Sequence, residues 1–115
     1  MDIEALQRKL GAFAAERDWE QFHSPKNLAM ALAAEAGELI ELFQWQSEAE
    51  SANPDPVQKT AVAHELADVL IYLLRLADRL DIDLDAAVSD KIRINAEKYP
   101  VALSKGNATK ADRRD

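Results

Sequence analysis

The sequence predicts an all-α protein with a single small domain, built as a four-helix bundle. Only three glycines and four prolines occur among its 115 residues, and β-branched residues are sparse. Alanine, leucine and long charged or amide side chains dominate, and these residue types favour helix. The length suits one domain with one modest core. We therefore expect helix through nearly all of the chain.

The first two helices are predicted over about residues 2–17 and 24–46. Apolar residues at helical spacing indicate the first helix, and they are Ile3, Leu6, Leu10 and Phe13. Ser24 followed by Pro25 is a favourable pair for the N-cap and first position of the second helix. The intervening segment "RDWEQFHS" is aromatic and poorly periodic, so we expect a loop there.

Two further helices are predicted over about residues 56–80 and 84–97, after the polar linker "SEAESANPDP". Asp55 can cap the third helix, with Pro56 at its first position and Gln58 at the capping-box position. Asp83 can cap the fourth helix, and Pro100 ends it. Residues 104–115 are predicted to be a disordered tail, which leaves residues 1–103 as the folded domain.

The third helix contains "LADVLIYLLRLADRL", which is apolar around most of its circumference. One partner helix could not cover such a surface. It is either the central helix of a monomeric bundle or part of an interface between copies. We expect the oligomer.

The composition excludes several classes of protein. A net charge of −7 and the absence of any basic stripe argue against a nucleic-acid partner. No apolar run approaches the length of a membrane span, and the N-terminus lacks the pattern of a signal peptide. A cytoplasmic location is the default expectation. The absence of cysteine excludes disulfides and thiolate metal sites.

Two pairs of acidic residues interrupt the apolar faces of the second and third helices. Glu35 and Glu38 are three residues apart within "AMALAAEAGELIELFQW", and Glu65 and Asp68 have the same spacing on the third helix. At about 100° per residue, each pair shares a face with residues expected in the core. Four carboxylates between packed helices would repel and cost several kcal/mol per ion in desolvation. Protonation or a cation would relieve that cost.

All-oxygen ligands suit a hard cation, Mg²⁺ or Mn²⁺. A di-iron carboxylate bundle would require Glu-x-x-His on two helices, and neither His23 nor His64 has that spacing. The alternative is that these acids pair with Lys or Arg at the edge of the apolar stripe, which suits a single acid better than two matched pairs. We therefore expect an open, hydrated metal site.

Several segments resemble the all-α MazG-like nucleoside triphosphate pyrophosphohydrolases, namely "EAGEL…FQW", "ELADVLIYLLRLAD" and "KIRINAEKYP". The likeness is greatest to the dCTP pyrophosphatase group, which also matches "AAERDWEQFHSPKNLAMAL", and it covers about residues 3–103. The family pattern is Glu-Glu-x-x-Glu on one helix and Glu-x-x-Asp on the next. Ala34 stands at the first position, a departure shared by that group, and the other positions are Glu35, Glu38, Glu65 and Asp68.

The resemblance implies a Mg²⁺-dependent enzyme that cleaves dCTP or a modified dCTP between the α- and β-phosphates. Such an enzyme serves house-cleaning or balances nucleotide pools. The four acids would be both metal ligands and catalytic residues, with one glutamate taking the proton of the attacking water. The resemblance also implies dimers or tetramers. A dUTP-type or broad-specificity pyrophosphatase remains an alternative, as does a non-catalytic helical oligomer that binds nucleotide.

Candidate substrate-binding residues fall into two groups. Trp19, His23 and Trp45 are expected to hold a pyrimidine base, and Tyr72 lies one turn beyond Asp68, where it could reach the sugar or a phosphate. The alternative for each is ordinary packing. On the fourth helix, one face suited to phosphate oxygens carries Lys91, Asn95 and Lys98. A solvated charged stripe is the alternative for that face.

Overall fold

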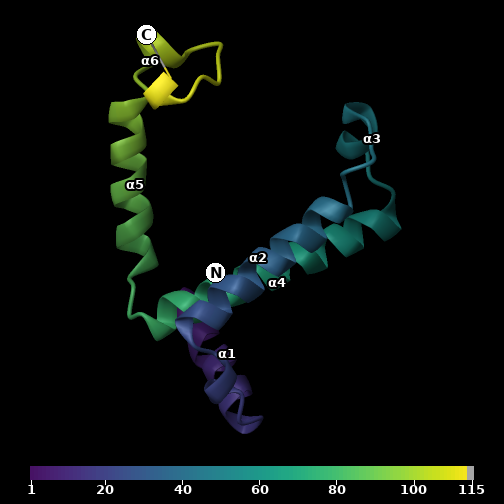
Figure 1. The fold of residues 1–115 in the computed structure, drawn as a ribbon, viewed down its shortest axis with the longest axis vertical. Coiled ribbons are helices and arrows are strands. Elements are labelled where there is room, and N and C mark those ends of the chain that lie inside the picture. The colour runs from purple at the N-terminus through teal and green to yellow at the C-terminus, as the bar shows by residue number, and fades with distance from the viewer. Residues whose placement is uncertain (114–115) are drawn as a thin grey trace. The chain divides into compact units, whose positions relative to one another are not determined.

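The computed structural model describes residues 1–113, and every regular element in that range is a helix (Figure 1). The chain forms two compact units, Met1–Asp81 and Ile82–Asp115. The first unit contains α1 (Ile3–Glu16), the 3-10 helix η1 (Glu20–Phe22), α2 (Pro25–Glu41), α3 (Glu48–Ala52) and α4 (Pro56–Arg79). The second contains α5 (Leu84–Lys98), α6 (Val101–Ser104) and the 3-10 helix η2 (Ala111–Arg113). The predicted all-α class is confirmed.

Side-chain caps begin the long helices where the sequence predicts them. The Ser24 hydroxyl accepts from the Asn27 N–H at 3.2 Å and places Pro25 at the first position of α2. The side chains of Asp55 and Asp83 likewise cap α4 and α5, accepting from the backbone N–H groups of Gln58 and Ala86 at 2.8 and 3.1 Å. Each cap satisfies a backbone N–H group that would otherwise lack a partner.

The predicted boundaries differ from the structure around residues 42–58. Helix α2 ends at Glu41 and not near Gln46, because the chain tightens into turns in which Phe43 and Gln44 both donate to the Ile40 carbonyl. The predicted linker contains α3, which begins with a reciprocal capping box between Ser47 and Glu50.

Gln58 does not complete the predicted capping box of α4. Its side-chain NH₂ donates instead to the Leu42 carbonyl at 3.0 Å and so ties the end of α2 to the beginning of α4. The predicted loop between α1 and α2 likewise contains a short helix, η1. The sequence identifies both stretches as connections, but the structure gives them more order than a loop or linker.

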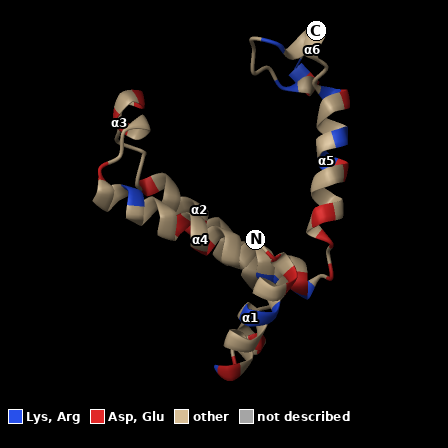
Figure 2. Cartoon of the chain, turned by 180° about the vertical axis from the view of Figure 1, so that it is seen from behind, with Lys and Arg blue, Asp and Glu red and all other residues tan. Residues whose placement is uncertain are grey.

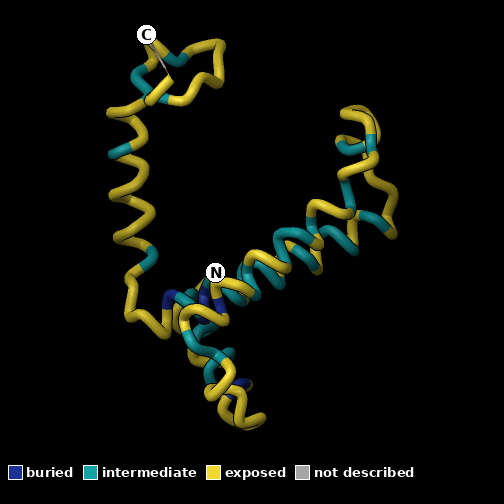
Figure 3. The backbone as a smooth tube through the Cα atoms, in the orientation of Figure 1, coloured by how far each residue is buried: buried dark blue, intermediate teal, exposed yellow. Residues whose placement is uncertain are grey.

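Helices α2 and α4 lie side by side, and α1 packs against α4 (Figure 1). The small core gathers where these helices meet (Figure 3), and its apolar members are Ala14, Leu28, Leu74 and Ala77. The Gln7 side chain donates to the Leu74 carbonyl at 3.1 Å, which fixes α1 against α4. No residue in the described part of the second unit is buried. Packing of α5 into a four-helix bundle therefore stays a prediction.

Large apolar side chains remain exposed on the paired helices, among them Met30, Ile40 and Leu66. Figure 2 shows few charged residues over the paired stretch of α2 and α4 apart from a group of acids. No helix in the described part of the chain is long and apolar enough to cross a membrane. Within the predicted disordered tail, residues 111–113 form η2, and residues 114–115 lie outside the described range. The domain boundary at residue 103 stays a prediction.

Candidate functional site

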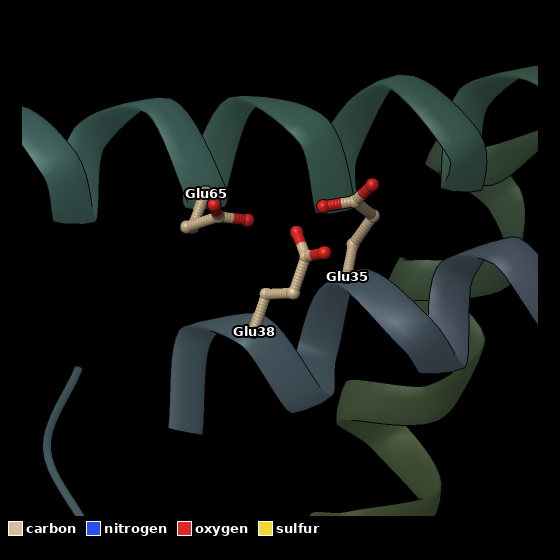
Figure 4. Close-up of side chains that lie close together, drawn as sticks. All are labelled: Glu35, Glu38 and Glu65. Atoms are coloured by element: carbon tan, nitrogen blue, oxygen red, sulfur yellow. The ribbon is translucent and has the colours of Figure 1, made fainter. Parts of the chain in front are cut away.

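Three carboxylates point toward one another where α2 and α4 pack (Figure 4). Glu35 and Glu38 of α2 and Glu65 of α4 each contribute one oxygen to a group whose members all lie within 4.8 Å of one another. We call these three residues the acidic cluster. Glu35 and Glu38 share a face of α2 because helical residues three apart are neighbours. Three of the four predicted metal ligands are thus brought together.

The acidic cluster raises the pKa of Glu35 from its ordinary value of 4.5 to about 7. The largest cause is a hydrogen bond with the Glu38 carboxyl group, which favours the protonated form of Glu35. Burial, a hydrogen bond with Glu65 and the charges of Glu38 and Asp68 act in the same direction. The arrangement therefore disfavours full ionisation of the cluster at neutral pH.

Two oxygens of the acidic cluster are buried and have no hydrogen-bond partner among the described residues. They are Oε2 of Glu35 and Oε2 of Glu65. Buried polar atoms in folded proteins normally have a partner, so these two oxygens are suited to binding a cation. An all-oxygen set of carboxylates fits a hard divalent cation.

Asp68, the fourth predicted ligand, does not belong to the three-carboxylate group. It lies three residues beyond Glu65 on α4, close enough for its charge to help raise the pKa of Glu35. Its side chain lines a neighbouring cavity. Asp68 thus connects the acidic cluster to the cavity, and its role as a metal ligand stays a prediction.

The neighbouring cavity has a volume of about 250 Å³ and lies within the first unit. It contains four of the predicted site residues, namely Trp19, His23, Asp68 and Tyr72. Its remaining lining residues come from α1 and α4, and they are Leu10, Phe13, Ala14, Ile71 and Arg75. We call this the aromatic cavity. It offers flat apolar walls together with a few polar groups, as small-molecule sites commonly do.

The turn after α1 delivers Trp19 to the aromatic cavity. Asp18 takes a left-handed conformation with φ 55°, and the Trp19 N–H donates to the Ala14 carbonyl at 2.9 Å. This C-terminal geometry satisfies carbonyls at the end of α1 and reverses the chain. The Trp19 ring then meets the Phe13 ring edge-on, with centroids 5.8 Å apart, and the His23 ring at 6.3 Å. Trp19 keeps 42% of its surface exposed, which leaves the ring accessible to a ligand.

Among the residues that the structure describes, Arg75 is the one polar residue lining the aromatic cavity that was not predicted from the sequence. It is only 5% exposed. Its Nη2 lies 3.5 Å from Nδ1 of His23, its Nη1 lies 3.5 Å from a carboxylate oxygen of Asp78, and its Nε has no partner among the described residues. The sequence signal for Arg75 is a single basic residue inside the apolar stretch "LIYLLRLAD". Arg75 lies four residues after Ile71 and seven residues after Asp68, so it shares a face of α4 with both.

These surroundings lower the pKa of His23, which favours its neutral form. Burial is the largest cause that lowers its pKa, followed by the positive charges of Arg75 and Arg79. An arginine side chain can only donate hydrogen bonds, so Nδ1 of His23 accepts from Arg75. The neutral ring then carries its proton on Nε2.

The other predicted substrate contacts lie outside the aromatic cavity. Trp45 follows the end of α2 in a turn, is 89% exposed and does not line the cavity of its own chain. Its contact with a base, in its own chain or in a neighbouring copy, stays a prediction. The predicted phosphate contacts are exposed on α5 in the second unit, and they are Lys91, Asn95 and Lys98. Their contact with substrate stays a prediction.

Comparison with known proteins gives consistent matches. A model of the MazG-like family matches residues 30–112. The proteins named dCTP pyrophosphatase 1 from Rattus norvegicus and Homo sapiens are 52% and 47% identical over 110 residues, which is 94% of this chain. The chain spans only 65% of the length of these relatives. A solved pyrophosphatase from Archaeoglobus fulgidus superposes with a TM-score of 0.81 at 42% identity, covering 87% of this chain and 94% of that one.

Proposed function

The chain belongs to the MazG-like family, and from that premise we propose that it is a metal-dependent nucleoside triphosphate pyrophosphohydrolase acting on dCTP. The acidic cluster carries the proposal, because partnerless carboxylate oxygens on two packed helices call for a cation. The names of the relatives support the substrate and the reaction class. The proposed products are dCMP and pyrophosphate.

The proposed metal is Mg²⁺, with Mn²⁺ as a substitute, held by Glu35, Glu38 and Glu65 together with Asp68. When bound, such a cation neutralises phosphate charge and lowers the pKa of a water molecule. The carboxylates would hold the cation, and through it the triphosphate, near the α2–α4 contact. One glutamate of the acidic cluster accepts the proton of the water that attacks the α-phosphorus.

The aromatic cavity is the proposed site for the base. Trp19 stacks against it, His23 contacts its edge, and the Tyr72 hydroxyl reaches the sugar or a phosphate. Asp68 marks the boundary between this region and the acidic cluster. The nucleoside and its phosphates would therefore occupy adjoining stretches of α4.

We propose that a second copy of the chain completes the site. The exposed apolar residues of α2 and α4 favour a dimer or tetramer, and the exposed Trp45 would contact a base held by a neighbouring copy. Lys91, Asn95 and Lys98 of α5 would bind phosphate oxygens.

A screen of nucleoside triphosphates tests the proposed function. Each is incubated with Mg²⁺ or with EDTA, and monophosphate, diphosphate, pyrophosphate and orthophosphate are quantified. We expect dCTP to give dCMP and pyrophosphate in equal amounts with Mg²⁺ and nothing with EDTA. Undiminished turnover in EDTA would contradict the metal site, and orthophosphate with dCDP would contradict the reaction.

A further inference from the structure

We propose that Arg75 selects cytosine by donating hydrogen bonds to the O2 and N3 acceptors of the base in the aromatic cavity. The inference rests on the proposed function, since it names the residue by which the same site chooses its substrate. It follows from the burial of Arg75, its unused donor and its place along α4.

The surroundings of Arg75 do not account for its burial. Only 5% of the residue is exposed, and its two polar contacts, with His23 and Asp78, are both as long as 3.5 Å. A guanidinium group has five N–H donors, and Nε lacks a partner among the described residues. Leaving a buried charged donor unsatisfied is costly. A ligand with acceptors at this wall of the cavity would remove that cost.

The absence of a side chain at Gly11 of α1 leaves room for the guanidinium group of Arg75. A Cβ atom built on Gly11 of α1 would lie 3.5 Å from Nη1 of Arg75, so the guanidinium group passes close to the α1 backbone there. Contacts with α1, His23 and Asp78 together hold the planar group in one place. A fixed planar fork suits recognition of two adjacent acceptors better than a mobile cation does.

The donors of Arg75 match cytosine and not uracil or thymine. Cytosine has two neighbouring acceptors, O2 and N3, on its pairing edge. Uracil and thymine carry a proton on N3, which would face the N–H groups of a side chain that cannot accept. Nδ1 of His23 already accepts from Arg75, so this histidine cannot offer that nitrogen to an N3–H group. Polar contacts at this wall therefore favour a base edge made of acceptors.

The place of Arg75 along α4 favours contact with the base over contact with phosphate. Asp68, Tyr72 and Arg75 lie at i, i+4 and i+7 and all line the aromatic cavity. Seven residues of helix correspond to a rise of about 10 Å. With the phosphates at the acidic cluster, the base would lie farther along this face, beside Trp19 and Arg75.

Two substitutions and a matched control test the inference. Arg75→Met keeps the length of the stem and removes every donor, and Arg75→Lys keeps the charge but loses the fork. The control is Arg8→Met, an exposed arginine on α1 that does not line the cavity. Far-UV circular dichroism and urea unfolding identify variants that fold.

Two readouts separate the inference from the proposed function. The first is the ratio of kcat/KM for dCTP to that for dUTP with Mg²⁺. The second is the ratio of the Kd values of dCMP and dUMP, measured by calorimetry in EDTA, which requires no turnover. We expect Arg75→Met and Arg75→Lys to lower both preferences for cytosine by roughly tenfold to a hundredfold, the discrimination typical of a bidentate contact to a base. Arg8→Met should leave both ratios unchanged.

Several outcomes would overturn the role of Arg75. An equal loss for dCTP and dUTP would make it a phosphate contact or a structural residue, and an unchanged ratio would remove it from recognition. Guanine also offers two adjacent acceptors, so a loss confined to dGTP would contradict the assignment to cytosine. If no triphosphate is hydrolysed but Arg75 still governs the preference for dCMP over dUMP, the proposed function fails and the inference stands.

Discussion

Replacing Glu35 by glutamine should stabilise the metal-free protein at alkaline pH. The pKa of Glu35 is raised to about 7 by a hydrogen bond with Glu38, by partial burial, by a hydrogen bond with Glu65 and by the negative charges of Glu38 and Asp68. A carboxyl group with a raised pKa favours the folded state only while it is protonated. Its unfavourable effect therefore begins as pH rises above about 4.5 and is complete above pH 7.

The size of the effect follows from the raised pKa. A change from 4.5 to about 7 corresponds to roughly 3–4 kcal/mol, at about 1.4 kcal/mol for each pH unit. Glu38 is exposed, so water screens the acidic cluster and reduces the expected effect to about 1–2 kcal/mol. Glutamine keeps the shape of the side chain and adds an NH₂ group that can donate to the remaining carboxylates.

The assay is urea unfolding in EDTA, followed by far-UV circular dichroism at pH 5 and pH 8 and at one protein concentration. Wild type should lose stability between pH 5 and pH 8, and the advantage of Glu35→Gln over wild type should grow across that range to about 1–2 kcal/mol at pH 8. The control is Glu41→Gln at an exposed position on the same helix, where a change within about 0.5 kcal/mol is expected. A Glu35→Gln variant that is no more stable than wild type at pH 8 would refute the reasoning.

Three further predictions concern the metal, the base and the core. Mg²⁺ at one hundred times its Kd should raise the unfolding free energy of wild type by about 2.7 kcal/mol, as measured by thermal melting. It should have little effect on Glu65→Gln. Equal stabilisation of both proteins would exclude Glu65 as a ligand. Trp19→Ala should raise KM for dCTP roughly tenfold to a hundredfold through lost stacking, as measured by initial rates, whereas a variant that only melts earlier would make Trp19 a packing residue. Leu74→Ala should lower the unfolding free energy by about 2–5 kcal/mol in urea unfolding, since Leu74 is only 1% exposed. Its KM for dCTP should stay unchanged, because Leu74 does not line the cavity. A smaller loss of stability would contradict the assigned core.

Local sequence signals were sufficient to predict the long helices and part of the site. Ser24, Asp55 and Asp83 cap helices as predicted, because a cap depends on residues only three positions apart. The acidic cluster was also predictable, since matched acid spacings on two apolar faces bring carboxylates together wherever those faces pack. The resemblance to the family is the source of the proposed substrate.

Features that depend on tertiary contacts were harder to predict. The early end of α2 moves Trp45 into an exposed turn, and Gln58 bonds to the Leu42 carbonyl across that turn instead of capping its own helix. Arg75 looked like one charge in an apolar helix, and only the packing of α1 and the turn after it shows that it lines a cavity. Asp68 has the spacing of a ligand and also lines the aromatic cavity, and this second location could not be predicted from spacing on one helix.

Hydrolysis of dCTP in ¹⁸O-labelled water with Mg²⁺ tests the proposed reaction most directly. Mass spectrometry of the products reads which phosphorus the water attacks, and Glu38→Gln serves as the variant with an impaired acidic cluster. We predict one ¹⁸O atom in dCMP, none in pyrophosphate, and little product from the variant. Label in pyrophosphate, or in orthophosphate accompanied by dCDP, would contradict attack at the α-phosphorus, and full activity of Glu38→Gln would contradict the acidic cluster as the catalytic centre.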